Sequence, residues 1–129
     1  MTDTPWLDDA SSLVDAFRAG ERSPKEELEA TFAAIDRSEL NCFSHLDPER
    51  AFAAAEKADL TKPFGGVPVG IKELEQVKGW PDTGASLLFK DRIAPNNSAV
   101  VDRFTGEGGA IPVGLTTSSE FGGLNVSIT

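Results

Sequence analysis

Apolar positions recur every three or four residues through the first half of the chain, which is the spacing of amphipathic helices. Residues 11–19 keep their apolar side chains on one face and stop at Gly20, so this stretch is predicted to be a helix. A second helix is predicted to begin after Ser23, with Pro24 at the first helical position and Glu26 completing a capping box. The first half is therefore predicted to be mainly helical.

Short apolar runs interrupted by glycine and proline dominate the second half, which is typical of strands and loops. Strands are predicted over residues 40–47, 67–72 and 110–115, an alanine-rich helix over 48–60, and a further helix beginning near Ser98. The fold class is therefore α/β, with amino-terminal helices followed by β-loop-helix-β elements.

Composition narrows the function classes. The 129 residues are 40% hydrophobic and 26% charged, enough for one modest globular domain. A net charge of −9 without a basic patch argues against nucleic acid or an anionic membrane as a partner. No run has the length of a membrane span or the pattern of a signal peptide, and the lone cysteine cannot form an internal disulfide, so the chain is predicted to be cytoplasmic.

Metal and histidine chemistry are also disfavoured by composition. With one histidine and one cysteine, neither a nitrogen and sulfur metal site nor a histidine-based triad is expected, and no cofactor is predicted. Cys42 and His45 lie three residues apart on a predicted strand, so they should face opposite sides. A core thiol and an imidazole at the rim are predicted, without a shared site.

A lysine closes the apolar run GVPVGIK. The strand period of two places Val67, Val69 and Ile71 on one face, and Gly70 beside Lys72 on the other, where the glycine leaves an open space. In one interpretation Lys72 marks the point where the strand emerges into solvent, and Glu73 and Glu75 follow it outward. In the other it faces a small cavity, and burial keeps the amine neutral and basic.

Two longer segments resemble the amino-terminal part of amidase-signature hydrolases: PFGGVPVGIKELEQVKGWPDTGAS and NNSAVVDRFTGEGGAIPVGLTTSSEFGGLNVSIT. The ordered matches extend over about sixty residues, far more than a short motif provides. The leading segments LVDAFRAGERSPKEELEATFAAI and LNCFSHLDPERAFAAAEKAD resemble the helices and strand that open the same family. The matching residues of the two longer segments are Gly66, Val67, Pro68, Val69, Ile71, Lys72, Gly79, Gly84, Ser86, Ser98, Val100, Val101, Arg103, Gly109, Ala110, Gly114, Thr116, Glu120, Phe121 and Asn125.

The resemblance implies a Ser-cisSer-Lys mechanism in which Lys72 is the base. One serine, on a non-proline cis peptide, relays the proton, and a second serine attacks the carbonyl. Thr117, Ser118 and Ser119 are candidate pocket-lining residues on the segment that is usually T-N-x-x-E-F. The sequence departs from the family pattern at Glu73, where aspartate is commoner, and at Leu115 and Thr117, which replace the lysine and asparagine of G-K-T-N.

The family's two serines come from a G-G-S-S-G-G-S stretch and a later loop, and neither is present in these residues. Residues 1–129 are therefore predicted to be the amino-terminal portion of one amidase-signature domain, with a mainly helical lead-in over 1–62 and the start of the core over 63–129. Amide hydrolysis is the expected family function, and the truncated chain is predicted to be inactive alone. Strands that would lie inside the complete sheet become edges, so poor solubility or dependence on a partner is expected.

The expected partners are a small-molecule amide substrate in the complete enzyme, and a second copy or a complementing carboxy-terminal fragment. Two alternatives remain open: a glutaminase-like subunit of a tRNA-dependent amidotransferase, or a non-catalytic interaction module that keeps Lys72 without its serines. Copurification with partner subunits would support the first alternative. A genuine stop codon after Thr129 would favour the second.

Overall fold

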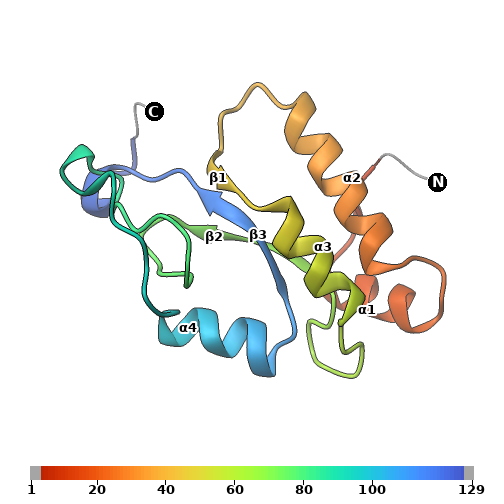
Figure 1. Ribbon diagram of the computed structural model, residues 1–129. Coiled ribbons are helices and arrows are strands. Elements are labelled where there is room, and N and C mark those ends of the chain that lie inside the picture. The colour runs from red at the N-terminus through yellow and green to blue at the C-terminus, as the bar shows by residue number, and fades with distance from the viewer. Residues whose placement is uncertain (1–3, 127–129) are drawn as a thin grey trace.

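The computed structural model describes residues 4–126, which form a three-layered α/β arrangement around a small mixed sheet (Figure 1). The predicted fold class is thus observed. The sheet has the strand order β1-β3-β2, with β1 antiparallel and β2 parallel to β3. The elements are α1 (Ala10–Arg18), α2 (Pro24–Arg37), β1 (Phe43–Leu46), α3 (Pro48–Glu56), β2 (Pro68–Lys72), η1 (Leu87–Phe89), α4 (Ala99–Asp102), η2 (Arg103–Glu107), β3 (Ile111–Thr116) and η3 (Glu120–Gly122).

Each of the four α-helices within residues 4–126 begins at a side-chain cap. Asp9, Ser23, Asp47 and Ser98 accept hydrogen bonds from backbone N–H groups of the first turns of α1, α2, α3 and α4, at 2.7, 3.1, 3.2 and 3.4 Å. The helix starts predicted at Ser23 and Ser98 are therefore confirmed. The backbone N–H of Ser12, bonded to the Asp9 carboxylate, lowers the pKa of Asp9.

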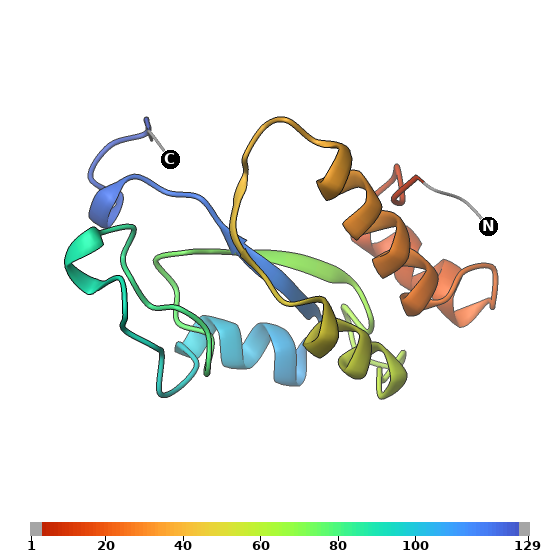
Figure 2. The same cartoon turned by 45° about the horizontal axis from the view of Figure 1, so that its top comes forward.

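An apolar core lies on each face of the sheet, and the helices divide between the two faces (Figures 1 and 2). Helices α2 and α3 cover one face and α4 covers the other. The first core contains Leu28, Ala51, Ile111 and Val113, and the second contains Ile71, Val77, Trp80, Val101 and Leu115. Helices thus pack against both faces of the sheet, and β3 is its most buried strand.

Strand β3 contributes side chains to both cores because its pairing with β2 contains a bulge. Pro112 lies opposite Val69, whereas Gly114 lies opposite Gly70, so Val113 is an extra residue. An extra residue reverses the alternation of side chains beyond it. Ile111 and Val113 therefore pack toward α2 and α3, whereas Leu115 packs toward α4.

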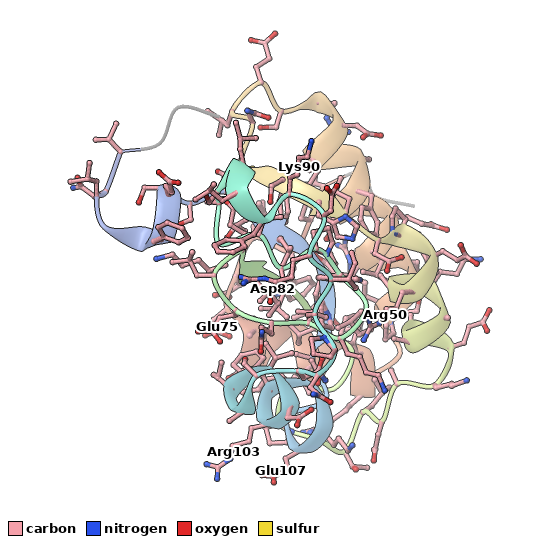
Figure 3. All side chains as sticks on the ribbon, turned by 60° about the vertical axis from the view of Figure 1, so that its left-hand side comes forward. Arg50, Glu75, Asp82, Lys90, Arg103 and Glu107 are labelled. Atoms are coloured by element: carbon pink, nitrogen blue, oxygen red, sulfur yellow. The ribbon has the colours of Figure 1, made fainter. Side chains whose placement is uncertain are left out.

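A buried tryptophan joins the loop after β2 to α3. The indole N–H of Trp80 donates to the Asp47 carboxylate at 2.7 Å, and the Arg50 guanidinium lies 5.5 Å from the centre of the indole ring. Arg50, which is labelled in Figure 3, also donates to the carbonyl oxygen of Lys78 in the loop after β2, at 2.7 Å. These contacts hold the loop after β2 against the start of α3. None of the helices in residues 4–126 has the length and apolar character needed to span a membrane.

Candidate functional site

The candidate site lies where the carboxyl ends of β2 and β3 meet. Lys72 is the last residue of β2, and it pairs in register with Thr116, the last residue of β3. Because parallel strands end at the same edge of a sheet, the segment Thr117–Ser119 emerges beside Lys72. The structure therefore brings together the backbone positions of Lys72 and of the three candidate pocket-lining residues.

A buried carboxylate ties the two strand ends together. Glu73 is 5% exposed, and its Oε1 accepts a hydrogen bond from the backbone N–H of Ser118 at 2.5 Å. The backbone N–H of Glu73 donates to the carbonyl oxygen of Thr116 at 3.0 Å. One residue thus holds both the end of β3 and the segment that follows it.

Glu73 is the site residue that the sequence-based argument missed. In the solvent-emergence interpretation of Lys72, Glu73 and Glu75 lead the chain outward, and for Glu73 this is wrong because the side chain is buried. The alternation of side chains along the strand predicts that Glu73 is buried. Extending the face of Val69 and Ile71 by one more alternate position places Glu73 on the core side.

The surroundings of Lys72 differ from the predicted dry cavity. Its side chain is exposed, and no group within residues 4–126 forms a hydrogen bond or ion pair with its ammonium. The predicted open space at Gly70 is also wrong, because a Cβ there would lie 2.8 Å from Cγ2 of Thr116. Residues 4–126 therefore hold Lys72 at the end of β2 but do not shield its side chain from water.

The hydroxyl groups after β3 are engaged with the backbone. The Thr117 hydroxyl and N–H both donate to the carbonyl oxygen of Cys42, at 3.5 and 2.9 Å, and the Ser118 hydroxyl donates to the carbonyl oxygen of Ser119 at 3.1 Å. The Ser119 hydroxyl donates to the carbonyl oxygen of Leu124. These bonds order the segment beside Lys72, and its role as pocket lining stays a prediction.

A second loop closes against the same segment. The Ser86 hydroxyl donates to Oε1 of Glu120 at 2.7 Å, and the N–H of Phe121 donates to the carbonyl oxygen of Gly84 at 2.9 Å. Ala85 and Phe121 have φ values of 58° and 52°, which are unusual for residues with a side chain. The two hydrogen bonds hold this loop against the segment that follows β3.

Cys42 and His45 do not form a second site. Cys42 is exposed, so the predicted core thiol is wrong. The imidazole of His45 is half-buried and packs edge-on against Trp80, with 5.2 Å between ring centres. Among residues 4–126, no three His, Cys, Asp or Glu side chains are grouped in a way that would hold a metal ion.

The family model for amidases matches residues 26–126, which include Lys72, Glu73 and the segment after β3. The chain belongs to the amidase family. A glutamyl-tRNA(Gln) amidotransferase subunit from Lachnospira eligens is 36% identical over 121 residues, covering 87% of this chain and 25% of the relative. The corresponding protein from Methylacidiphilum infernorum is 38% identical over 103 residues, covering 78% of this chain and 21% of the relative. The amidase chain thus spans about a quarter of the length of these curated relatives.

Solved structures of amidases share the fold. A 6-aminohexanoate cyclic dimer hydrolase superposes with a TM-score of 0.79 at 27% identity, over 88% of this chain and 24% of the other. A bacterial aryl acylamidase of the amidase signature family superposes with a TM-score of 0.81 at 23% identity, over 93% of this chain and 27% of the other. The resemblance noted from the motifs is therefore confirmed, and the part of the amidase fold that this chain shares comprises its helices together with the small mixed sheet.

Proposed function

We propose that these residues form the base-bearing part of an amide-hydrolysing site, in which Lys72 accepts the proton of a hydroxyl nucleophile. The observation that carries this proposal is the position of Lys72 at the carboxyl edge of β2, inside the region matched by the amidase model. Glu73 holds the segment beside it through Ser118. The reaction converts a carboxamide to a carboxylate and releases ammonia or an amine.

The chemistry needs three things that these residues do not supply together. A hydroxyl nucleophile must stand beside the lysine, donors must stabilise the oxyanion, and water must be kept away so that the amine is neutral. Lys72 is exposed within residues 4–126, so further protein surface has to cover it. We therefore expect the 129 residues alone to hydrolyse no amide.

The proposed setting follows from the same reasoning. Residues 1–129 form the amino-terminal portion of one domain, and the substrate is a small-molecule amide bound by the complete enzyme. A second copy or a complementing carboxy-terminal fragment is the proposed protein partner. We also propose a cytoplasmic location, because the net charge of −9 and the single cysteine suit a reducing, soluble compartment.

The test replaces the lysine in a complemented enzyme. Residues 1–126 would be joined to the remainder of the Lachnospira eligens relative, and ammonia release from glutamine and from a simple aryl amide would be measured. Lys72→Ala should lower kcat/KM by about a hundredfold to ten-thousandfold, as loss of a general base does. Lys78→Ala, which removes another exposed lysine six positions on, is the control and should retain activity.

The first of two outcomes would contradict Lys72 as the base, and the second would contradict the expected inactivity of the 129 residues alone. Equal activities of the two lysine variants would show that Lys72 is not the base. Amide hydrolysis by the purified 129-residue chain, abolished by Lys72→Ala, would show instead that the residues at hand suffice. A non-catalytic interaction module predicts a complemented enzyme that folds and remains inactive.

A second candidate is the glutaminase-like component of a tRNA-dependent amidotransferase. The relatives from Lachnospira eligens and Methylacidiphilum infernorum, at 36% and 38% identity, are named as components of such an enzyme and favour this function. Copurification of the complemented chain with the other amidotransferase subunits would decide for it. Activity on simple amides without such partners would favour a free-standing amidase.

A further inference from the structure

Residues 4–8 precede α1 and form neither helix nor strand, and we call them the strap. The backbone N–H of Trp6 donates to both carboxylate oxygens of Glu27 in α2, at 3.0 and 3.3 Å. The indole N–H of Trp6 donates to the Ser12 hydroxyl in α1, at 2.8 Å. Trp6 therefore ties the strap to both helices.

A buried ion pair holds the strap in place. Nε of Arg22 lies 2.7 Å from Oε2 of Glu27, and the two residues are 8% and 3% exposed. Nη2 of Arg22 donates to the carbonyl oxygen of Thr4 at 2.8 Å, and the guanidinium lies 6.0 Å from the centre of the Trp6 ring. A buried carboxylate or guanidinium needs such partners, because burial removes its hydration. The ion pair thus fixes the strap at Thr4 and, through Glu27, at Trp6.

Most of the strap is exposed to solvent. Leu7 is 89% exposed, and Thr4 and Asp8 are also exposed. Helix α1, by contrast, has a buried apolar face that includes Leu13 and Phe17. Segments that bury little apolar surface open at a lower free energy than the core does. The strap should therefore detach while α1 stays packed.

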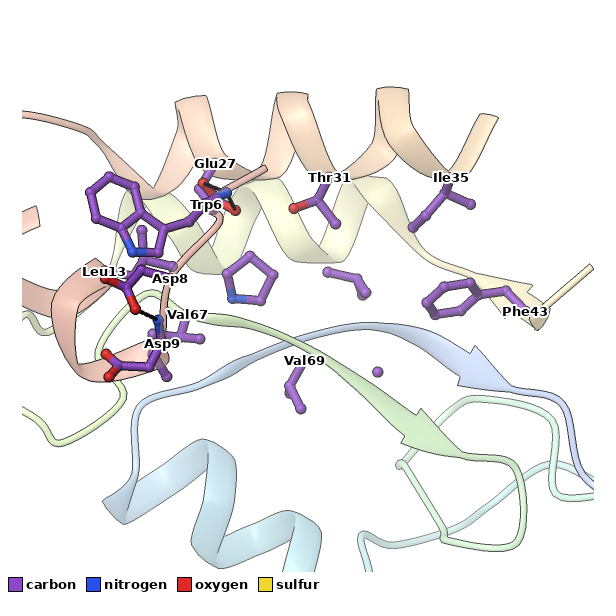
Figure 4. A pocket seen from close by; sticks show the side chains of 14 residues that line it. Trp6, Asp8, Asp9, Leu13, Glu27, Thr31, Ile35, Phe43, Val67 and Val69 are labelled. Carbon is purple, nitrogen blue, oxygen red and sulfur yellow. Dashed lines mark hydrogen bonds between the residues drawn. The ribbon is translucent and has the colours of Figure 1, made fainter. Parts of the chain in front are cut away.

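The strap lies between two pockets. Trp6 and Asp8 line both of them, one of about 310 Å³ between α2 and β2 and one of about 460 Å³ beside Arg22. Most side chains that line the first pocket are apolar, and Leu13 lies at the end that the strap covers (Figure 4). Figure 4 also shows Trp6 bonded to Glu27 at this end. Detachment of the strap joins the two pockets and uncovers Leu13.

We propose that the strap is a gate, which opens and closes as one unit while the rest of the chain stays folded, and that the Arg22–Glu27 pair is its latch. In the closed form Glu27 accepts the N–H of Trp6. In the open form water replaces the strap at both charged groups, which limits the free energy of opening. The open gate admits small apolar molecules to the pocket between α2 and β2. The proposal does not involve Lys72, so its outcome is separate from that of amide hydrolysis.

Amide hydrogen exchange at low urea concentrations tests whether the gate opens by itself. The Trp6 amide reports on the strap, and the Ile111 amide, which donates to the Val67 carbonyl at 2.8 Å, reports on the sheet. Opening of the strap exposes little surface, so the protection of the Trp6 amide should not depend on urea. The protection of the Ile111 amide should be at least about a hundredfold greater, and it should fall as urea is added.

Paired variants test the latch. Glu27→Gln should speed up exchange of the Trp6 amide about tenfold to a hundredfold, because the N–H loses a charged acceptor. Glu26→Gln, at an exposed position in the same helical turn, is the matched control and should leave the rate unchanged. Ser12→Ala removes the acceptor of the indole N–H and should speed up the exchange about twofold to tenfold, whereas Ser11→Ala should not. The serine variants keep the ion pair, so they test the gate even if Glu27→Gln does not fold.

Thiol labelling tests whether the gate controls access to the pocket. Leu13→Cys in a Cys42→Ser chain places the only cysteine of the chain at a pocket-lining position that is 4% exposed. Val101→Cys in the same background is the control, since Val101 is 2% exposed and belongs to the core on the α4 side. Iodoacetamide, a small neutral reagent, should label the first thiol faster than the second, at a rate that low urea does not change. Ser12→Ala should raise the labelling rate at position 13 by the same factor as the exchange of the Trp6 amide.

Three results would overturn the proposal. Trp6 and Ile111 amides with equal protection and the same urea dependence would show that the strap opens only when the whole chain unfolds. Equal exchange of the Trp6 amide in each variant and its matched control would show that these contacts do not hold the gate. Cysteines at positions 13 and 101 that are labelled equally slowly would show that the strap does not control the pocket.

Discussion

At the scale of single residues, Glu73 holds in place the segment that lies beside Lys72, the candidate base. Its carboxylate is buried, and it accepts the N–H of Ser118, which lies 45 positions away in the sequence. A buried carboxylate is tolerated where backbone donors satisfy it, and a buried donor left without an acceptor is costly. The carboxylate therefore couples the end of β2 to the segment after β3.

Replacement of Glu73 by alanine should destabilise the chain by about 1–3 kcal/mol, because the Ser118 N–H loses its acceptor. Urea unfolding followed by circular dichroism would measure the loss, and hydrogen exchange of the Ser118 amide would locate it. Glu73→Gln keeps an acceptor oxygen and should cost less. Glu75→Ala, on a half-buried neighbour, should change stability by no more than about 0.5 kcal/mol. An unfolding midpoint unchanged in Glu73→Ala would refute this role.

At the scale of elements, local signals decide the helix starts. Ser23 caps α2, with Pro24 at its first position, as the sequence predicts. Replacing Ser23 by alanine should lower the free energy of unfolding by about 1 kcal/mol, because the Glu26 N–H loses its acceptor. Ser11→Ala, on the exposed face of α1, should cause no comparable loss. Equal stabilities of the two variants would contradict the capping role.

The elements and the motif could be predicted from the sequence, whereas the surroundings of the site could not. Caps, periodicity and glycine positions act over a few residues, so α2 and the three strands follow from local patterns. The exposure of Lys72 depends on what packs over β2, and the filled space at Gly70 depends on Thr116 of the neighbouring strand. Such contacts join residues far apart in sequence, so local sequence patterns cannot predict them.

At the scale of the whole molecule, a charged surface is combined with many exposed apolar side chains. Large hydrophobic residues that are exposed in residues 4–126 include Leu7, Leu40, Leu87, Leu88, Ile93, Val100, Phe121 and Leu124. Exposed apolar side chains favour association, while the net charge of −9 opposes it. The balance between apolar attraction and charge repulsion should therefore depend on the salt concentration.

Self-association should increase with ionic strength, because salt screens the repulsion and leaves the apolar attraction. Sedimentation velocity at about 20 mM and about 500 mM NaCl, where the Debye length falls severalfold, would measure it. Replacing Leu87 and Leu88, which are 88% and 80% exposed, by serine should reduce association at high salt. A chain that is monomeric at both salt concentrations, with a sharp thermal transition, would contradict this expectation.

The bulge in β3 also bears on how amidase sequences are aligned. Val113 is the extra residue that lets β3 contribute to both cores. A deletion between Pro112 and Gly114 would turn the following side chains to the opposite face, so Leu115 would leave its core. An alignment gap at this point therefore marks either an error of alignment or a relative whose sheet packs differently. In this chain the number of residues in β3 decides which core Leu115 enters.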